Sequence, residues 1–325
     1  MALPLLGRCR DSRAEVGTAP EPCVMCASRS VHHLFAARDR LYNLPGDFWV
    51  VRCASCALLR TSPRPSGEAL ARYYPDGYRP HGEADAPPAA TEEVPGFWRR
   101  LRRRVASRRI WWIPDLPPGA RVLELGSAAG HFVRDALARG WEVHALEPAA
   151  RPAGRLARDS RVRVHREPAE AMSFPPGSLD AVFAWMVVEH LEDPAAVLRK
   201  VSAALRPGGY FVFSVPNAGS WELVAFRERW YALQVPTHLW HFSPRTLRAL
   251  LYMCGLRVDR IFHQKVLRNV TGSLDLVGED SPRLVGVTRR LARVLSLSYV
   301  SFVIGTVLAA FRQGGRLTVV ARKRG

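Results

Sequence analysis

Four of the six cysteines in this 325-residue chain occur as two pairs, each with two residues between its members. The pairs are Cys23/Cys26 and Cys53/Cys56. A CxxC turn presents two thiolates from one loop, and four thiolates satisfy the tetrahedral coordination of zinc. We expect one structural zinc ion, because four protein ligands leave no open position for catalysis. Two disulfides or a redox role are weaker alternatives, since Cys9 and Cys254 stay unpaired and neither pair opens a helix after a βαβ strand.

A second stretch that could do chemistry is RVLELGSAAGHFV, residues 121–133. It reads as an apolar strand, a tight loop with Gly126 and Gly130, and the start of a helix, which is how an open α/β sheet holds a nucleotide. A dinucleotide fingerprint needs a third glycine, but Ala128 stands midway between these two. Glu147 ends the next strand, 21 residues after Gly126, where a carboxylate can accept both ribose hydroxyls of NAD or of S-adenosylmethionine. The loop alone therefore predicts a nucleotide site without deciding the nucleotide.

The elements needed to position these residues follow from the hydrophobic pattern after residue 120. Strand patterns alternate with helical patterns that begin at the N-cap residues Asp193 and Ser243, and Gly255 closes the second of these helices. The expected strands cover 121–125, 141–147, 161–165, 179–188, 209–217, 256–264 and 315–323. This alternation predicts an α/β fold with a seven-stranded, mostly parallel, doubly wound (Rossmann-like) sheet, which binds its ligand at the carboxyl ends of the strands.

The rest of the chain divides by composition. We expect residues 1–20 to be disordered and not to form a signal peptide, and residues 21–80 to form a small zinc-ribbon-like module with a short helix after Ser66. Residues 81–96 are rich in proline, alanine and glutamate and predict a linker to a domain at 97–325. The hydrophobic content of 48% is ordinary for a globular protein.

Charge and hydropathy leave several partners open. The net charge of +18 indicates either an anionic partner or an arginine-rich proteome. Seven arginines between Arg99 and Arg109 predict an amphipathic lead-in helix, with contact to nucleic acid or anionic lipid as the alternative. Residues 294–311 carry no charge; we expect a helical core or a hydrophobic cap near the substrate, with membrane-surface contact as the alternative.

Four segments decide the nucleotide. In order and spacing, RVLELGSAAGHF, HALEP, AWMVVEHLEDPAAVLRKVSAALRPGGYFVFSVPN and THLWHFSPRTLRALLYMCGLRV resemble the class I S-adenosylmethionine-dependent methyltransferases, from about Arg121 to Lys323. EHLEDP followed by LRPGG is the most specific part. The cysteine pairs followed by SPRPSGEALARYYPDGY resemble the zinc-binding lead segment of a bacterial subset, some of which act on sugars, natural products or cell-surface polysaccharide precursors.

This resemblance implies roles in holding S-adenosylmethionine. Glu124 would orient the amino group, Gly126 would let the methionine moiety lie against the backbone, and Glu147 would bind the ribose. Pro168 stands where the family often has an acid, so the Ala169 N–H and Glu170 would contact adenine. The predicted cofactor set is Glu124, Gly126, Ser127, Gly130, Glu147, Pro148, Ala169 and Glu170.

Histidines near the expected acceptor site are candidate bases, because a neutral imidazole can take a proton near neutral pH. The candidates are His241 first, then His238 and His190, and the loop from Trp230 to Phe242 is expected to cover the methyl group. Some relatives bind a divalent metal through a glutamate three positions before the EH pair. Met186 stands there, so no catalytic metal is expected. SVPN replaces an NPPY-like tetrapeptide, which disfavours methylation of adenine N6 or cytosine N4.

The leading hypothesis is methyl transfer from S-adenosylmethionine to a small molecule, a sugar, or a glycan- or lipid-linked precursor. The alternatives are an RNA methyltransferase that grips phosphates with the arginine helix, and a non-catalytic binding protein that retains the fold. We expect a cytoplasmic bacterial enzyme, with peripheral contact at the inner membrane face as an extension of the lipid-linked case.

Overall fold

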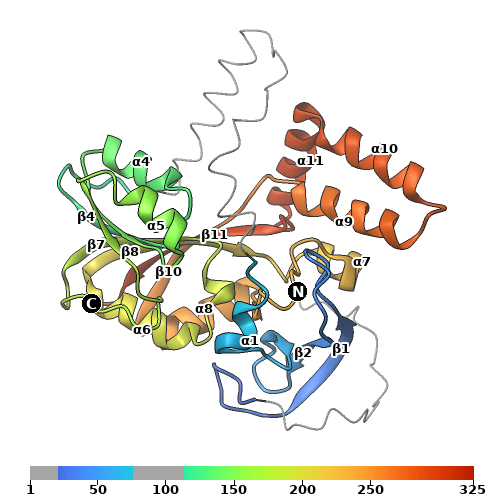
Figure 1. The fold of residues 1–325 in the computed structure, drawn as a ribbon, viewed down its shortest axis with the longest axis horizontal. Helices are drawn as coiled ribbons and strands as arrows, with labels where there is room; N and C mark the ends of the chain where they lie inside the picture. The colour runs from blue at the N-terminus through green and yellow to red at the C-terminus, as the bar shows by residue number, and fades with distance from the viewer. Residues whose placement is uncertain (1–20, 76–112) are drawn as a thin grey trace.

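The computed structural model describes residues 21–75 and 113–325, and its main feature is a seven-stranded sheet (Figure 1). The strand order is β10-β11-β8-β7-β4-β5-β6, and only β11 runs antiparallel to its neighbours. The strands are β4 (Arg121–Leu125), β5 (Glu142–Leu146), β6 (Val162–His165), β7 (Leu179–Trp185), β8 (Leu205–Pro216), β10 (Leu256–His263) and β11 (Arg316–Lys323). The predicted fold class and strand number are confirmed.

Helices cover both faces of this sheet (Figure 1). The helices are α4 (His131–Ala138) and α5 (Ala150–Leu156) on one face, and α6 (Pro194–Ala204) and α8 (Pro244–Met253) on the other. Phe132 and Leu156 pack into one buried cluster, whereas Leu198 and Leu247 belong to another, so the sheet separates two cores. The strands therefore read as apolar on both faces, as a doubly wound sheet requires.

Local sequence signals start the helices where they were expected. The Asp193 carboxylate accepts a hydrogen bond from the Ala196 N–H at 2.9 Å, and Ser243 forms a capping box with Thr246. Two strand boundaries differ by three residues or more. The strand predicted for 209–217 begins at Leu205. The strand predicted for 179–188 ends at Trp185, because Met186 adopts a positive φ of 58° and the chain turns into the short helix η2 (Val188–His190).

A second, four-stranded sheet lies at the N-terminal end of the chain. Its order is β1-β2-β3-β9, and its strands are β1 (Val31–Ala37), β2 (Phe48–Cys53), β3 (Leu59–Ser62) and β9 (Trp240–His241). The short helix α1 (Gly67–Ala71) follows β3, as the sequence predicts. Because β9 belongs to the later part of the chain, the N-terminal module is hydrogen-bonded directly to the part that forms the seven-stranded sheet.

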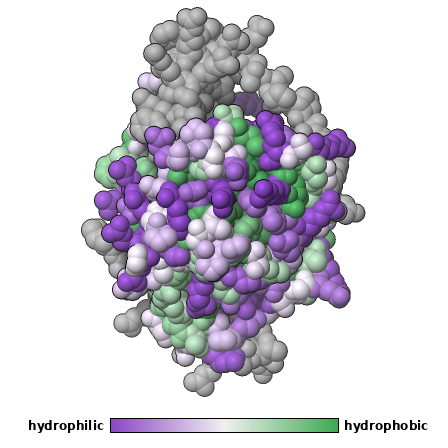
Figure 2. All heavy atoms as spheres, turned by 90° about the vertical axis from the view of Figure 1, so that its left-hand side faces the viewer, coloured by the Kyte–Doolittle hydropathy of each residue, from purple (hydrophilic) through white to green (hydrophobic). Residues whose placement is uncertain are grey.

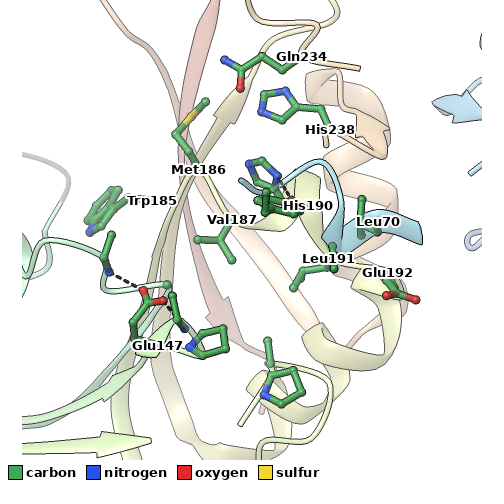
Figure 3. Close-up of a pocket in the computed structure, with 18 of the residues that line it drawn as sticks. Leu70, Glu147, Trp185, Met186, Val187, His190, Leu191, Glu192, Gln234 and His238 are labelled. Atoms are coloured by element: carbon green, nitrogen blue, oxygen red, sulfur yellow. Dashed lines mark hydrogen bonds between the residues drawn. The ribbon is translucent and has the colours of Figure 1, made fainter. Parts of the chain in front are cut away.

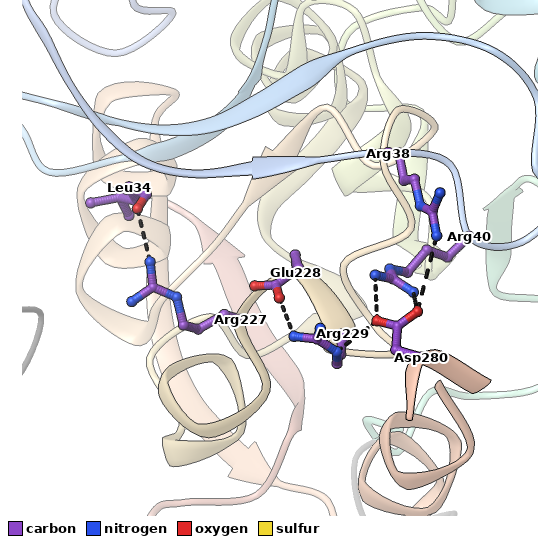
Figure 4. Close-up of polar contacts among 7 residues, drawn as sticks. All are labelled: Leu34, Arg38, Arg40, Arg227, Glu228, Arg229 and Asp280. Atoms are coloured by element: carbon purple, nitrogen blue, oxygen red, sulfur yellow. Dashed lines mark hydrogen bonds and ion pairs between the residues drawn. The ribbon is translucent and has the colours of Figure 1, made fainter. Parts of the chain in front are cut away.

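An ion-pair network makes a further contact between these parts (Figure 4). The Asp280 carboxylate accepts two hydrogen bonds from the Arg40 guanidinium, at 3.0 and 2.9 Å, and pairs with Arg229 Nε at 2.7 Å. Arg40 follows β1, whereas Asp280 ends the helix α9 (Arg268–Asp280). The neighbouring arginines lower the pKa of Asp280, with Arg40 contributing most, so the carboxylate remains charged in this contact.

Three helices form an extension between β10 and β11: α9, α10 (Val285–Ser296) and α11 (Ser298–Ala310) (Figure 1). The helical expectation for 294–311 is correct, but the expectation of a core helix is wrong. Tyr299 and Phe311 are 72% and 74% exposed, and Gly305 is the buried residue of α11. In the described part of the chain, no single helix is long and apolar enough to span a membrane; α10 and α11 pass that test only as a pair bent by 85°.

The remaining predictions on the N-terminal residues 1–20, the linker 81–96 and the arginine-rich helix lie outside the described residues. The remaining short helices are α7 (Trp221–Phe226) and η3 (Arg227–Arg229), which lead from β8 towards β9.

Candidate active site

A cavity with a volume of about 810 Å³ lies at the carboxyl ends of the parallel strands (Figure 3). Residues that follow β4, β5 and β7 line one end, and residues from α1, η2 and the segment before β9 line the other. Open α/β sheets bind ligands at this edge, so the cavity lies where the sequence predicts a site.

Glu147 anchors the first end of the cavity. Its Oε2 accepts a hydrogen bond from the Ala128 N–H at 2.7 Å, and its Oε1 accepts one from the Ala149 N–H at 2.9 Å (Figure 3). Each carboxylate oxygen retains a lone pair, so the side chain can still accept hydrogen bonds from two adjacent hydroxyl groups. This geometry fits a ribose, as predicted for this residue.

The loop after β4 brings the backbone close to its surroundings. Gly126 lines the cavity with a φ of +65°, and a Cβ there would lie 2.7 Å from Val187 Cγ2. Only glycine adopts such a conformation without strain. The structure therefore requires glycine at this position for packing as well as for access of a ligand to the backbone.

Three residues of the predicted cofactor set do not line the cavity: Glu124 in β4, and Ser127 and Gly130 in the loop itself. Glu124 is 3% exposed, and burial raises its pKa well above the ordinary value. Ser127 Oγ donates to the Glu124 carbonyl at 3.3 Å, which holds the loop in place. The structure therefore gives these residues a supporting position behind the cavity wall.

The segment predicted to hold adenine does line the cavity, through Pro168, Ala169 and Glu170, together with Pro148 after β5. Glu170 Oε1 accepts a hydrogen bond from the Glu192 N–H at 3.1 Å. The segment is thereby tied to the turn before α6, and its position is set by the fold.

His190 lies at the other end of the cavity, next to His238 (Figure 3). Its Nδ1 is 3.0 Å from the Thr237 carbonyl oxygen and 2.9 Å from Tyr74 Oη. Because a carbonyl oxygen only accepts, Nδ1 carries the proton and Nε2 carries the lone pair. Burial lowers the pKa of His190 to about 4, so the ring is neutral at physiological pH and can accept a proton.

His238 repeats this arrangement deeper in the wall. Its Nδ1 lies 2.9 Å from the Ala232 carbonyl oxygen, and burial lowers its pKa well below the ordinary value. Glu189 lies beside both rings, fully buried, and its carboxylate oxygens have no hydrogen-bond partner among the described residues. Burial raises the pKa of Glu189 to about 8, so this carboxyl is largely protonated at neutral pH.

The structure places His241, the first candidate base, outside the cavity. His241 belongs to β9, is 3% exposed, and its Nε2 lies 3.3 Å from Thr61 Oγ1. Burial lowers its pKa to about 3. Of the loop from Trp230 to Phe242, the residues that line the cavity are Tyr231, Gln234 and His238, so only the first part of that loop faces the space.

The sequence analysis missed several residues that line the acceptor end, among them Leu41, Leu70, Tyr74, Arg268 and Arg316. Arg316 was detectable. It begins the antiparallel final strand, so it lies beside Pro216 at the carboxyl end of β8. Nothing in the local sequence around Tyr74 indicates contact with a residue 116 positions later.

The four paired cysteines lie close together in the N-terminal module. Their sulfur atoms all lie within 4.8 Å of one another, and the Cys23–Cys56 and Cys26–Cys53 pairs are 3.5 Å apart. All four are free thiols. A tetrahedron of zinc–sulfur bonds requires a sulfur–sulfur spacing of about 3.8 Å, so the residues fit one zinc ion. The four cysteines form no disulfide bonds in this structure, in contrast to the alternative of two disulfides.

We expect purified protein to contain one zinc per chain, and Cys53→Ser to reduce this content strongly, because three thiolates bind zinc more weakly than four. Metal analysis of both proteins tests this, with Cys254→Ser as the matched control, since Cys254 lies apart from the cluster. Much less than one zinc in the wild-type protein, or an equal content in the Cys53 variant, would show that the cluster serves another purpose.

Comparisons with known proteins agree with the site. A family described as a methyltransferase domain matches residues 91–261, more than half of the chain. The ubiquinone biosynthesis O-methyltransferase of Xanthomonas campestris is 30% identical over 157 residues, which cover 44% of this chain and 65% of that protein. The malonyl-[acyl-carrier protein] O-methyltransferase of Serratia marcescens is 30% identical over 148 residues, 44% of this chain and 56% of that protein.

The chain thus matches less than two thirds of the length of these curated relatives. Among solved structures, the [4+2]-cyclase SpnF superposes with a TM-score of 0.51 at 16% identity, over 80% of this chain and 97% of that one, which is a likeness of fold. The family match agrees with the loop after β4, the position of the Glu147 carboxylate and the order of the strands. The chain belongs to the methyltransferase-domain family and is a class I S-adenosylmethionine-dependent methyltransferase.

Proposed function

We propose that this enzyme methylates a hydroxyl oxygen of a small-molecule acceptor, with His190 as the proton acceptor. The observation that carries the proposal is the His190 ring at the acceptor end of the cavity, held through Nδ1 by the Thr237 carbonyl oxygen with Nε2 free to accept a proton. The names of the two curated O-methyltransferases support transfer to oxygen.

The residues at the two ends of the cavity have different roles: one end positions the cofactor and the other binds the acceptor. Bound S-adenosylmethionine supplies a methyl group already activated by its sulfonium. Glu147 and the backbone after β4 fix its position, and the apolar side chains of Val187 and Leu191 exclude water from the space beyond. His190 takes the hydroxyl proton onto Nε2, and Tyr74 and Thr237 keep its ring in place.

The walls indicate the acceptor's shape. Leu41, Leu70 and Leu191 offer apolar contact, whereas Arg268 and Arg316 place two cations at the same end. An acceptor with an apolar body and a carboxylate or phosphate group fits both features. Such a molecule belongs to the predicted class of lipid-linked or glycan-precursor acceptors.

A radiolabelled-methyl transfer screen tests the proposal. Extracts separated into small polar molecules, lipids and RNA are incubated with the enzyme and labelled S-adenosylmethionine. We expect label in a small-molecule or lipid fraction, as a methyl ether by mass spectrometry. Label confined to RNA, or methylation of nitrogen or carbon, would contradict the proposal. The arginine-rich helix on which the RNA alternative rests lies outside the described residues.

A further inference from the structure

The unusual surface of this protein is on the helical extension, where large apolar side chains face solvent. Leu284, Val287, Leu291 and Val294 are each 46–65% exposed and recur at helical spacing along α10. The buried residues of α10 are Thr288 and Ala292, and Val285 and Leu295 on the same face are half-buried. A surface helix of a globular protein normally turns its large apolar residues inward, so α10 is oriented the other way round.

Helix α11 continues the same surface. Tyr299, Phe302, Val303 and Val307 are 40–72% exposed, and Phe311 follows at 74%. Most of the exposed large hydrophobic residues of the described chain lie between Leu284 and Phe311, the segment called here the apolar hairpin. By contrast, hydrophilic side chains predominate on the side of the molecule that carries α4 and α5 (Figure 2).

All charged side chains within residues 281–312, which include the apolar hairpin, are positive. Residues 281–312 contain no aspartate or glutamate, and their arginines are Arg283, Arg289, Arg290, Arg293 and Arg312. Apolar side chains combined with arginine are the features of a helix that lies in the interface of an anionic membrane.

The dimensions favour lying on a membrane rather than crossing it. At 1.5 Å per residue, the 13 residues of α11 extend about 20 Å, less than the roughly 30 Å of a hydrocarbon core. The 85° bend between α10 and α11 prevents the two from forming one straight span.

We propose that the apolar hairpin docks this enzyme on the surface of an anionic lipid bilayer. The hairpin is joined to the site, because α10 packs along α9 (Figure 1), and α9 begins at Arg268 in the cavity wall. That the acceptor is lipid-linked rests on the proposed function. In that case, docking would bring the head group of the acceptor lipid to the acceptor end of the cavity. The docking itself is independent of that conclusion.

Vesicle sedimentation tests the docking without any acceptor. Wild-type protein is mixed with vesicles of phosphatidylcholine alone or with phosphatidylglycerol added. We expect binding to the anionic vesicles that weakens with salt, and little binding to the neutral ones. The variant with Val287→Ser, Tyr299→Ser and Phe311→Ser should bind at least about tenfold more weakly, since three exposed side chains lose their apolar contact.

Matched controls separate docking from general effects. Met253→Ser removes an apolar residue that is 48% exposed on α8, and should leave vesicle binding unchanged. S-adenosylmethionine affinity, measured by calorimetry, should be equal in all variants and confirms the fold. Equal vesicle binding by wild type and the triple variant overturns the proposal. So does a wild-type dimer that the triple variant converts to a monomer, because a second copy would then cover the hairpin.

Discussion

Replacing His190 by alanine is expected to lower turnover by about a hundredfold or more, the usual scale for loss of a positioned base. The ring accepts the hydroxyl proton in the proposed reaction, and no other imidazole is bonded both to Tyr74 and to a backbone carbonyl among the described residues. Affinity for S-adenosylmethionine should change little, because Glu147 and the loop after β4 lie at the other end of the cavity. Single-turnover kinetics and calorimetry measure the two quantities.

The matched control is His32→Ala, which removes an exposed histidine of β1 and should leave turnover unchanged. The pH dependence gives an independent check. Because burial lowers the pKa of His190 to about 4, the ring stays neutral well below pH 6.5. On the acid side, turnover should therefore fall only as the pH approaches about 4. A fall centred near pH 6.5, or a fully active His190 variant, would exclude this histidine as the base.

Replacing Glu147 by alanine is expected to weaken S-adenosylmethionine binding by roughly ten- to a hundredfold, the equivalent of about 1.5–3 kcal/mol for charge-assisted hydrogen bonds. The substitution removes the predicted ribose contact and also the acceptor for the Ala128 and Ala149 amides. Calorimetric titration measures the change.

Glu142→Ala is the matched control, because Glu142 begins the same strand with an exposed side chain and should bind S-adenosylmethionine as the wild type does. Circular dichroism of both variants verifies folding. A folded Glu147 variant with unchanged affinity would mean that the ribose lies elsewhere in the cavity.

Local sequence was sufficient for the sheet, because each strand carries its own signal. The strands are short apolar runs between helices with recognisable caps, such as Asp193 and Ser243. The cofactor end of the cavity was predictable for the same reason: Gly126, Glu147 and Ala169 each follow a strand end directly or within a few residues.

The acceptor end depends on contacts between distant segments, which local patterns do not reveal. His190, His238 and His241 look alike in sequence, but only pairing between β3 and β9 draws His241 into the interior beside Thr61. The same limit applies to α11. Its composition is that of a core helix, yet it belongs to an insertion between two strands at the edge of the sheet, where no layer formed by the described residues covers it.

The pairing of β3 with β9 has a consequence for how acceptor preference could be exchanged. Leu41, Leu70 and Tyr74 form part of the acceptor wall, and all three lie in the N-terminal segment before residue 76. The residues predicted to contact S-adenosylmethionine all lie after residue 120. A chimera that receives residues 21–75 from a relative with another acceptor should therefore inherit part of the donor's substrate range while keeping its own cofactor affinity. The segment that carries the cysteine cluster would then be a portable determinant of selectivity.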